Sequence, residues 1–142
     1  MINTIRIPPQ SLDAERSVLG SMLLLNEAID DIDLRPDEFY RDEHQAAFTV
    51  VRDMWRDGRR SIDVVTLAEE LRRRDQFDSI GGAVFLAELM DTVPHAAHVR
   101  HYAKLVRQKA QQRNLIYACT DAIEKAYCGE SDEVSQNSTQ AC

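Results

Sequence analysis

The stretch from His95 to Cys128 constrains the fold most, because its 34 residues include no Gly or Pro. It is rich in Ala, Leu, Lys, Arg and Gln, which all have high helix propensity. Pro94 precedes it and Gly129 follows it, as is usual at the two ends of a helix. Its apolar and aromatic residues recur close to the 3.6-residue helical period, at Val99, Tyr102, Val106, Ala110, Ile116, Ile123 and Tyr127. The pattern predicts one long helix.

This predicted helix is long compared with the rest of the chain. At 1.5 Å per residue it would span roughly 50 Å, whereas the 94 residues before it would have a radius of gyration of about 12 Å. We therefore expect its second half to project. That half carries two apolar stripes, Ile116, Thr120, Ile123 and Tyr127 on one and Leu115, Cys119, Ala122 and Ala126 on the other. A projecting helix with two apolar stripes needs partners, so we predict oligomerisation through Leu115, Ile116, Cys119, Ile123 and Tyr127.

The first 94 residues read as five short helices and no strand. Ser11, Asn26 and Asp63 are expected N-caps, Asp42 and Gln45 have the spacing of a capping box, and Gly81-Gly82 introduces the fifth helix. The residues expected to face inward from the last two helices are Val65, Leu67, Ala68, Leu71, Phe85, Leu86, Leu89 and Met90. The predicted fold class is all-α, with a small helical bundle as head (1–94) and the long helix (95–128) after it.

The last segment, 129–142, differs in composition. Its apolar residues are only Val134, Ala141 and Cys142, and they follow no helical or strand period. Such a segment buries too little apolar surface to order itself, so we expect a disordered tail.

Charge is unevenly distributed along the chain. The net charge is −7, of which the first 94 residues carry −8 and the predicted long helix carries +4. An acidic head is a poor nucleic-acid binder. On the long helix the candidate phosphate contacts are Arg100, Lys104, Arg107 and Arg113, although a solvated polar face explains the same cations.

The motifs of several functional classes are missing. No GxxxxGK[ST], GxSxG or HExxH sequence occurs, and His95, His98 and His101 have no carboxylate or Cys at ligand spacing to complete a metal site. We therefore predict no catalytic, cofactor-binding or metal-binding residue in this chain. No apolar run approaches the roughly 20 residues that span a membrane, and the N-terminus lacks the apolar stretch of a signal peptide. The expected location is the cytoplasm.

An ordered series of short motifs points to a known family. The motifs are Pro8-Pro9-Gln10-Ser11-Leu12, Ala14-Glu15, Val18-Leu19-Gly20, Leu34-Arg35-Pro36, Phe39-Tyr40-Arg41, His44, Asp63, Val65-Thr66-Leu67-Ala68-Glu69-Glu70-Leu71, Ile80-Gly81-Gly82, Val93-Pro94, Ala96-Ala97, Tyr102-Ala103, Val106, Lys109-Ala110, Arg113 and Leu115-Ile116. Each motif is weak alone, but the set in this order resembles the N-terminal domain of DnaB-family replicative DNA helicases. The resemblance covers about Pro8 to Cys128.

The resemblance implies a helical head joined to a helical hairpin, of which the long helix is the first arm. In that family such domains form a collar on a hexameric ring, and the collar docks the primase. ATP, Mg²⁺ and unwinding belong to a following RecA-like motor domain, which this sequence does not contain. The implied partners are further copies of the chain and the primase, with DNA contacted weakly or indirectly. Phe85, Ile116 and Ile123 are the expected primase contacts, unless Phe85 belongs to the core.

Three features depart from the family pattern. The connection from Ile29 to Leu34 is a residue or two shorter than usual, and His95 occupies a place where a Ser or Thr N-cap is common. The segment after Gly129 lacks the apolar pattern of a second hairpin arm. Two functions therefore compete: a non-catalytic assembly and primase-docking module of a replicative helicase, and a small helical DNA-binding or regulatory protein that uses the basic long helix.

Overall fold

A computed structural model of the chain describes residues 6–92 and 94–129. In chain order its elements are α1 (Leu12–Leu24), η1 (Asn26–Asp31), η2 (Pro36–Glu38), α2 (Asp42–Arg56), α3 (Val64–Arg73), α4 (Gly82–Asp91), η3 (Ala96–His98) and α5 (Val99–Tyr127), where η marks a 3-10 helix. The described residues contain no strand, so the all-α prediction is confirmed. Of the predicted disordered tail, 129–142, only Gly129 is among the described residues, so the prediction is not tested.

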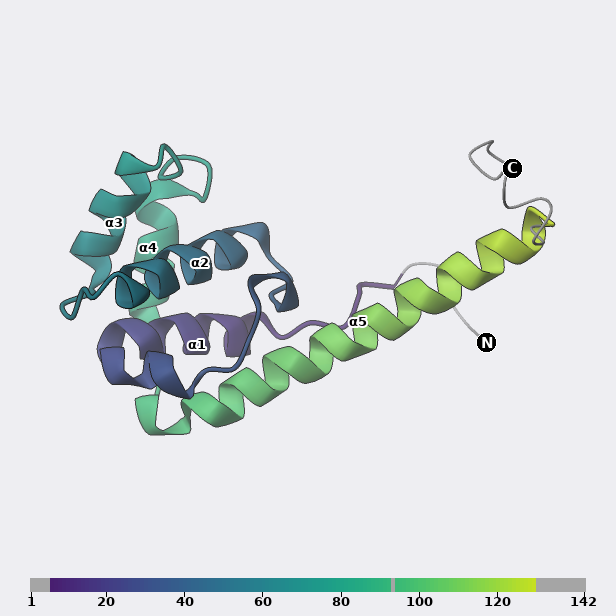
Figure 1. Cartoon of the computed structure of the whole chain (residues 1–142), viewed down its shortest axis with the longest axis horizontal. Coiled ribbons are helices and arrows are strands. Elements are labelled where there is room, and N and C mark those ends of the chain that lie inside the picture. The colour runs from purple at the N-terminus through teal and green to yellow at the C-terminus, as the bar shows by residue number, and fades with distance from the viewer. Residues whose placement is uncertain (1–5, 93, 130–142) are drawn as a thin grey trace. The chain divides into compact units, whose positions relative to one another are not determined.

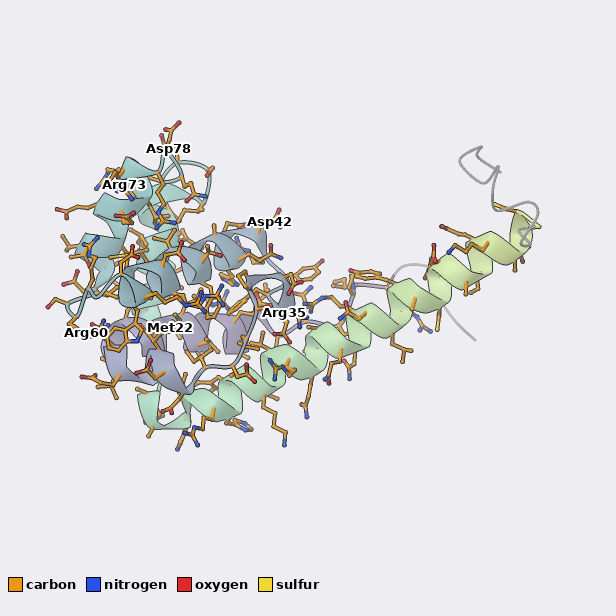
Figure 2. The ribbon with its side chains drawn as sticks, viewed as in Figure 1. Met22, Arg35, Asp42, Arg60, Arg73 and Asp78 are labelled. Atoms are coloured by element: carbon orange, nitrogen blue, oxygen red, sulfur yellow. The ribbon has the colours of Figure 1, made fainter. Side chains whose placement is uncertain are left out.

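The chain divides into two compact units, and the larger is Pro9–Ala110. Within it α1 contacts α2 and α4, and α3 also contacts α2 and α4, so the four helices close on one another (Figure 1). The buried side chains between them include Val18, Leu19, Met22, Phe39, Phe48, Val51, Met54, Leu67, Leu71, Phe85 and Leu89. Figure 2 shows the side chains of Arg60 and Arg73 at the outer surface of this bundle. Among the described residues, the second unit comprises 6–8 and 111–129.

Two of the predicted helix starts are confirmed by side-chain caps. The hydroxyl of Ser11 accepts a hydrogen bond from the backbone N–H of Ala14 (3.3 Å) at the start of α1. The carboxylate of Asp63 accepts one from the N–H of Thr66 (2.9 Å), and the Thr66 hydroxyl in turn accepts one from the N–H of Asp63 (2.9 Å). This reciprocal pair satisfies N–H groups that a helix start otherwise leaves unpaired.

Two other predicted caps are wrong, because longer-range partners take the side chains. The amide of Asn26 donates to the carbonyls of Met22 and Ile62 (2.8 Å each) and accepts from the N–H of Ile62 (2.9 Å), which joins η1 to the segment before α3. Gln45 donates to the carbonyl of Phe39 (2.8 Å) instead of closing a capping box with Asp42. Arg41, and not Asp42, is the residue before α2.

A buried carboxylate on α1, in place of the predicted capping box, accepts hydrogen bonds from backbone N–H groups at the start of α2. Glu15 is 1% exposed, and its carboxylate accepts hydrogen bonds from the N–H groups of Tyr40 (2.6 Å) and Arg41 (3.4 Å). The same carboxylate lies 2.6 Å from Nδ1 of His44, whose ring is fully buried. A negative charge at a helix N-terminus is stabilised by the unpaired N–H groups there. Glu15 therefore fixes the start of α2 against α1.

A second carboxylate ties α3 to its surroundings. Glu70 accepts hydrogen bonds from Arg74 (2.9 Å), Arg59 (3.3 Å) and Arg73, and Arg74 also bonds to Asp53 on α2 (3.0 Å). The hydrogen bonds from Arg73 and Arg74, with that of Arg73 the larger, lower the pKa of Glu70 from its usual 4.5 to about 2. Because the folded pKa is lower than the unfolded one, the ionised carboxylate stabilises the fold above pH 4.5. That stabilisation is lost as the pH falls toward 2.

Glu70→Gln is expected to lower the free energy of unfolding by about 1–2 kcal/mol at pH 7, since charge-assisted hydrogen bonds to solvent-accessible arginines are worth about that much. The deficit relative to the wild type should shrink as the pH falls from about 4.5 toward 2. Denaturant unfolding across this range measures it, with the exposed neighbour Glu69→Gln as control. A deficit of equal size at pH 7 and pH 2.5 would contradict the assignment.

Candidate protein interface

Helix α5 begins later than predicted. The 3-10 turn Ala96–His98 precedes it, and the side chain of His95 makes no capping hydrogen bond. From Val99 onward the helix has two parts with different surroundings. Val99, Ala103, Val106 and Ala110 are buried in the first part, at the three- and four-residue spacing of one helix face.

The second part of α5 exposes its apolar side chains to solvent. Exposed fractions are 67% for Leu115, 46% for Ile116, 56% for Ile123 and 88% for Tyr127, and Cys119 is exposed as well. These five are the residues that the sequence predicts for oligomerisation. Tyr117, which that prediction omits, is 53% exposed. Tyr117 lies outside both predicted stripes, and its aromatic side chain was the only feature of the sequence that could have indicated its exposure.

The two apolar stripes of α5 adjoin each other. With 100° between successive residues, the stripe of Ile116, Ile123 and Tyr127 and the stripe of Leu115 and Cys119, with their smaller members, together cover about 160° of the helix circumference. A surface helix typically turns little more than 100° of apolar surface toward a single core. The α5 face, defined here as these stripes over residues 115–127, is therefore wide enough to contact two neighbours.

Two of the four candidate phosphate contacts on α5 form ion pairs inside the larger unit. Arg100 forms an ion pair with Asp31 (2.8 Å), and Arg107 forms ion pairs with Glu38 (3.0 Å) and Asp33 (3.3 Å). The hydrogen bond to Glu38 raises the pKa of Arg107, and the one to Asp31 raises the pKa of Arg100. These two cations neutralise carboxylates of this chain. They are thus poorly placed to bind the phosphates of another molecule.

The other two candidate cations lie in opposite settings. Arg113 is only 5% exposed, whereas Lys104 lies on the exposed side of α5. The structure therefore does not assemble the four cations into one open basic patch.

Phe85, the third expected primase contact, is in the core. It is 3% exposed, its ring centroid lies 5.8 Å from that of His44, and it belongs to the buried cluster between the helices. Of the two roles left open by the sequence, the structure favours the core role. Ile116 and Ile123, by contrast, are both accessible.

Two residues that were expected to face inward are exposed on the head. Met90 on α4 is 65% exposed and Val65 on α3 is 61% exposed, so the prediction was wrong for both. Each lies next to an inward-facing residue of its helix, Leu89 in one case and Val64 in the other. A helix of about ten residues contains too few turns for its apolar periodicity to show where its buried face ends.

Among residues 6–92 and 94–129, no group of three or more His, Cys, Asp or Glu side chains is placed to hold a metal ion. Within the same residues, no helix is both long enough and apolar enough to cross a membrane.

The fold and the exposed α5 face define a helical domain with surface for protein contacts. The chain belongs to the DnaB-like helicase N terminal domain family, whose model matches residues 7–108. The replicative DNA helicase DnaB of Mycobacterium leprae (strain TN) is 44% identical over 126 residues, which are 87% of this chain and 21% of the relative. The chain therefore spans about a fifth of the length of that relative.

Solved structures agree with this assignment. The crystal structure of the N-terminal domain of DnaB helicase from Mycobacterium tuberculosis matches with a TM-score of 0.83 and 42% identity, over 94% of this chain and 96% of that one. The structure of a DnaB-like replicative helicase and its interactions with primase matches with a TM-score of 0.68 and 27% identity, over 83% of this chain and 28% of that one. The predicted family is thus confirmed, together with its helical fold.

Proposed function

We propose that this chain acts as a non-catalytic assembly and primase-docking domain of a replicative DNA helicase. The observation that carries the proposal is the α5 face, whose apolar residues stay in water in the isolated chain. Leaving such surface exposed is unfavourable by about 25 cal/mol per Å², so a partner that covers it is favoured. Membership of the DnaB N-terminal family indicates which partners to expect.

The first expected partner is another copy of the chain. Ile116, Ile123 and Tyr127 form one edge of the α5 face, and the same residues on a second copy offer a matching surface. A contact of this kind between identical surfaces closes a symmetric dimer. In the full-length family such contacts would contribute to the collar of a hexamer.

The second expected partner is the primase. The relative solved in a study of its interactions with primase has the same fold over most of this chain, which supports the proposal. Because both partners are proposed to contact Ile116 and Ile123, self-association and primase binding are expected to compete for this edge of the α5 face. Ile116 and Ile123 remain the proposed docking residues, whereas the burial of Phe85 argues against direct contact by that side chain.

The competing DNA-binding role has less support. Arg100 and Arg107 are paired with carboxylates of the head, and the first 94 residues carry a net charge of −8. Duplex DNA is held mainly by cations that neutralise its phosphates. We therefore propose weak or indirect contact with DNA.

Catalysis is proposed to lie outside this chain. The sequence has no GxxxxGK[ST] motif for nucleotide phosphates, so ATP and Mg²⁺ are assigned to the motor domain of the family. The proposed role in chromosome replication places the protein in the cytoplasm.

Titration with the primase of the same organism tests the proposal. We expect a dissociation constant in the micromolar range, because a single helix face provides less than the roughly 800 Å² per partner of a standard interface. Ile123→Ala should weaken binding by about 2 kcal/mol, or roughly 30-fold, if it is a central contact. Val84→Ala, which truncates an exposed apolar residue of the head, is the matched control.

Duplex DNA replaces the primase in a parallel titration. The proposed role predicts binding that is weak at 50 mM salt and lost by 200 mM salt, as expected for a few phosphate contacts. Nanomolar affinity for DNA at physiological salt would support the DNA-binding alternative. No measurable primase binding would contradict the docking role.

A further inference from the structure

The larger unit contains an apolar groove that is separate from the α5 face. It has a volume of about 400 Å³ and lies where α1, the start of α3 and the end of α4 meet. Apolar side chains line most of it, namely Leu23, Leu24, Val64, Leu89, Met90 and Pro94. The volume is in the range of sites that bind organic groups, and its lining favours aliphatic side chains.

The rims of the groove are apolar as well as its floor. Leu24 is 66% exposed and Met90 is 65% exposed, whereas Leu89 is 2% exposed. A small molecule in the groove would leave both rim side chains in water. A helix laid along the groove would cover the floor and the rims together, which is how amphipathic helices bind to grooves of this kind.

Carboxylates lie in the groove and beside it. Asp63 contributes to its lining, and the hydrogen bond from the N–H of Thr66 lowers the pKa of Asp63, so this carboxylate is charged at neutral pH. A neighbouring hollow shares Thr92 with the groove and is lined by Asp13, Arg16, Ser17, Glu88, Asp91 and Thr92. Its one cation, Arg16, is already paired with Asp13 (2.6 Å). The surface around the groove therefore has an excess of negative charge.

We propose that this groove binds an amphipathic helix of a partner protein, with a row of apolar side chains flanked by Lys or Arg. The apolar row fills the groove between Leu24 and Met90, and the flanking cations lie beside Glu88, Asp91 and Asp63. Charge complementarity of this kind speeds association and selects among apolar helices. The inference is independent of the function proposed for the α5 face, because it uses other residues.

The charges argue against the other occupants. The same groove on a second copy would bring two acidic rims together, and facing like charges are unfavourable. The apolar part of α5 of a second copy is no better suited, since residues 115–127 include one cation, Lys125, which is paired with Asp121 (3.2 Å). Nucleic acids and anionic membranes are repelled by the same carboxylates.

Two synthetic peptides test the proposal with the full chain. Both carry the same leucine row on one face of an 18-residue helix, with lysines on the other face in one peptide and glutamates in the other; this length of about 18 residues gives roughly 27 Å of helix. Fluorescence anisotropy at 50 mM salt should give binding of the lysine peptide at least about tenfold tighter than that of the glutamate peptide. Equal affinities would overturn the charge-based choice of partner.

Substitutions locate the binding site. Leu24→Gln with Met90→Gln should weaken the lysine peptide at least about tenfold, whereas Val84→Gln, a residue 70% exposed on α4, should leave it unchanged. Glu88→Gln with Asp91→Asn should weaken only the lysine peptide and reduce its salt dependence. Because these side chains are exposed, far-UV circular dichroism should show an unchanged fold.

Three outcomes would overturn the inference. The first is no binding of the lysine peptide, and the second is an equal loss in the Val84→Gln control, which would mean general adhesion. The third is a lower sedimentation coefficient of the free chain after the Leu24→Gln and Met90→Gln changes, since this would show that a second copy fills the groove. Primase binding through Ile123 is measured separately, so failure here leaves the proposed function of α5 standing.

Discussion

Phe85→Ala is expected to lower the free energy of unfolding by about 3–5 kcal/mol, the usual cost of removing a buried aromatic ring. Phe85 is 3% exposed and packs beside His44, which itself is held by Glu15. The substitution leaves a cavity where α4 meets α2, and the surrounding helices close it only in part. At 4–8 °C per kcal/mol for a domain of this size, the melting temperature should fall by at least about 10 °C.

Val84→Ala is the matched control for this substitution, because Val84 is the adjacent residue and is 70% exposed. It should change the free energy of unfolding by less than about 0.5 kcal/mol. Thermal unfolding and primase binding are measured on both variants. A Phe85→Ala chain that keeps its melting temperature and loses primase binding would show that Phe85 is a docking residue, contrary to its position in this structure.

The elements that the sequence predicted best are those decided by neighbouring residues. The helix starts at Ser11 and Asp63 follow from side chains that bond to N–H groups three residues ahead. Helix α5 follows from a long run of good helix formers between Pro94 and Gly129. In both cases the interactions that decide the structure lie within one or two helical turns, so they can be identified without the fold.

The features that the sequence could not predict depend on residues far apart in the chain. Glu15 stabilises the start of α2 from another helix, 29 positions before its partner His44. The ion pair of Arg107 with Glu38 joins positions 69 apart. Local pattern therefore assigned Arg107 to a solvated or phosphate-binding face, and it assigned the start of α2 to a capping box of Asp42 and Gln45. Only packing of the helices brings the true partners together.

The sequence could predict the part of the candidate site whose apolar residues repeat along a helix with no partner segment in the sequence to cover them. Ile116, Ile123 and Tyr127 repeat with helical spacing in the second part of α5, and they are exposed. Phe85 and Met90 show the opposite difficulty. Both lie on the same short helix α4, one buried and one exposed, and their apolar character alone does not separate a core residue from a surface one.

Ile116→Asp with Ile123→Asp is expected to abolish self-association of the chain. The two side chains lie on one stripe of α5, close to the same angle around the helix. Burying an unpaired carboxylate in an apolar contact costs several kcal/mol, so two of them should weaken a micromolar dimer by more than about 100-fold. Both residues are about half exposed in the isolated chain, so the head should keep its helical content.

A control on the same helix separates apolar contact from charge. Asn114→Asp with Lys125→Gln changes the net charge by the same amount, but places the change on the opposite side of α5. This variant should associate nearly as the wild type does. Loss of association in the control would point to general electrostatic repulsion.

Sedimentation velocity of the wild type and of both variants, from about 1 to about 500 μM, tests the assembly role of α5 most directly. The range brackets the micromolar dissociation constant expected for a contact smaller than a standard interface. The wild type and the Asn114/Lys125 variant should sediment faster as concentration rises, while the Ile116/Ile123 variant stays monomeric throughout. A wild-type chain that remains monomeric at every concentration would contradict the proposal that the α5 face is an assembly surface.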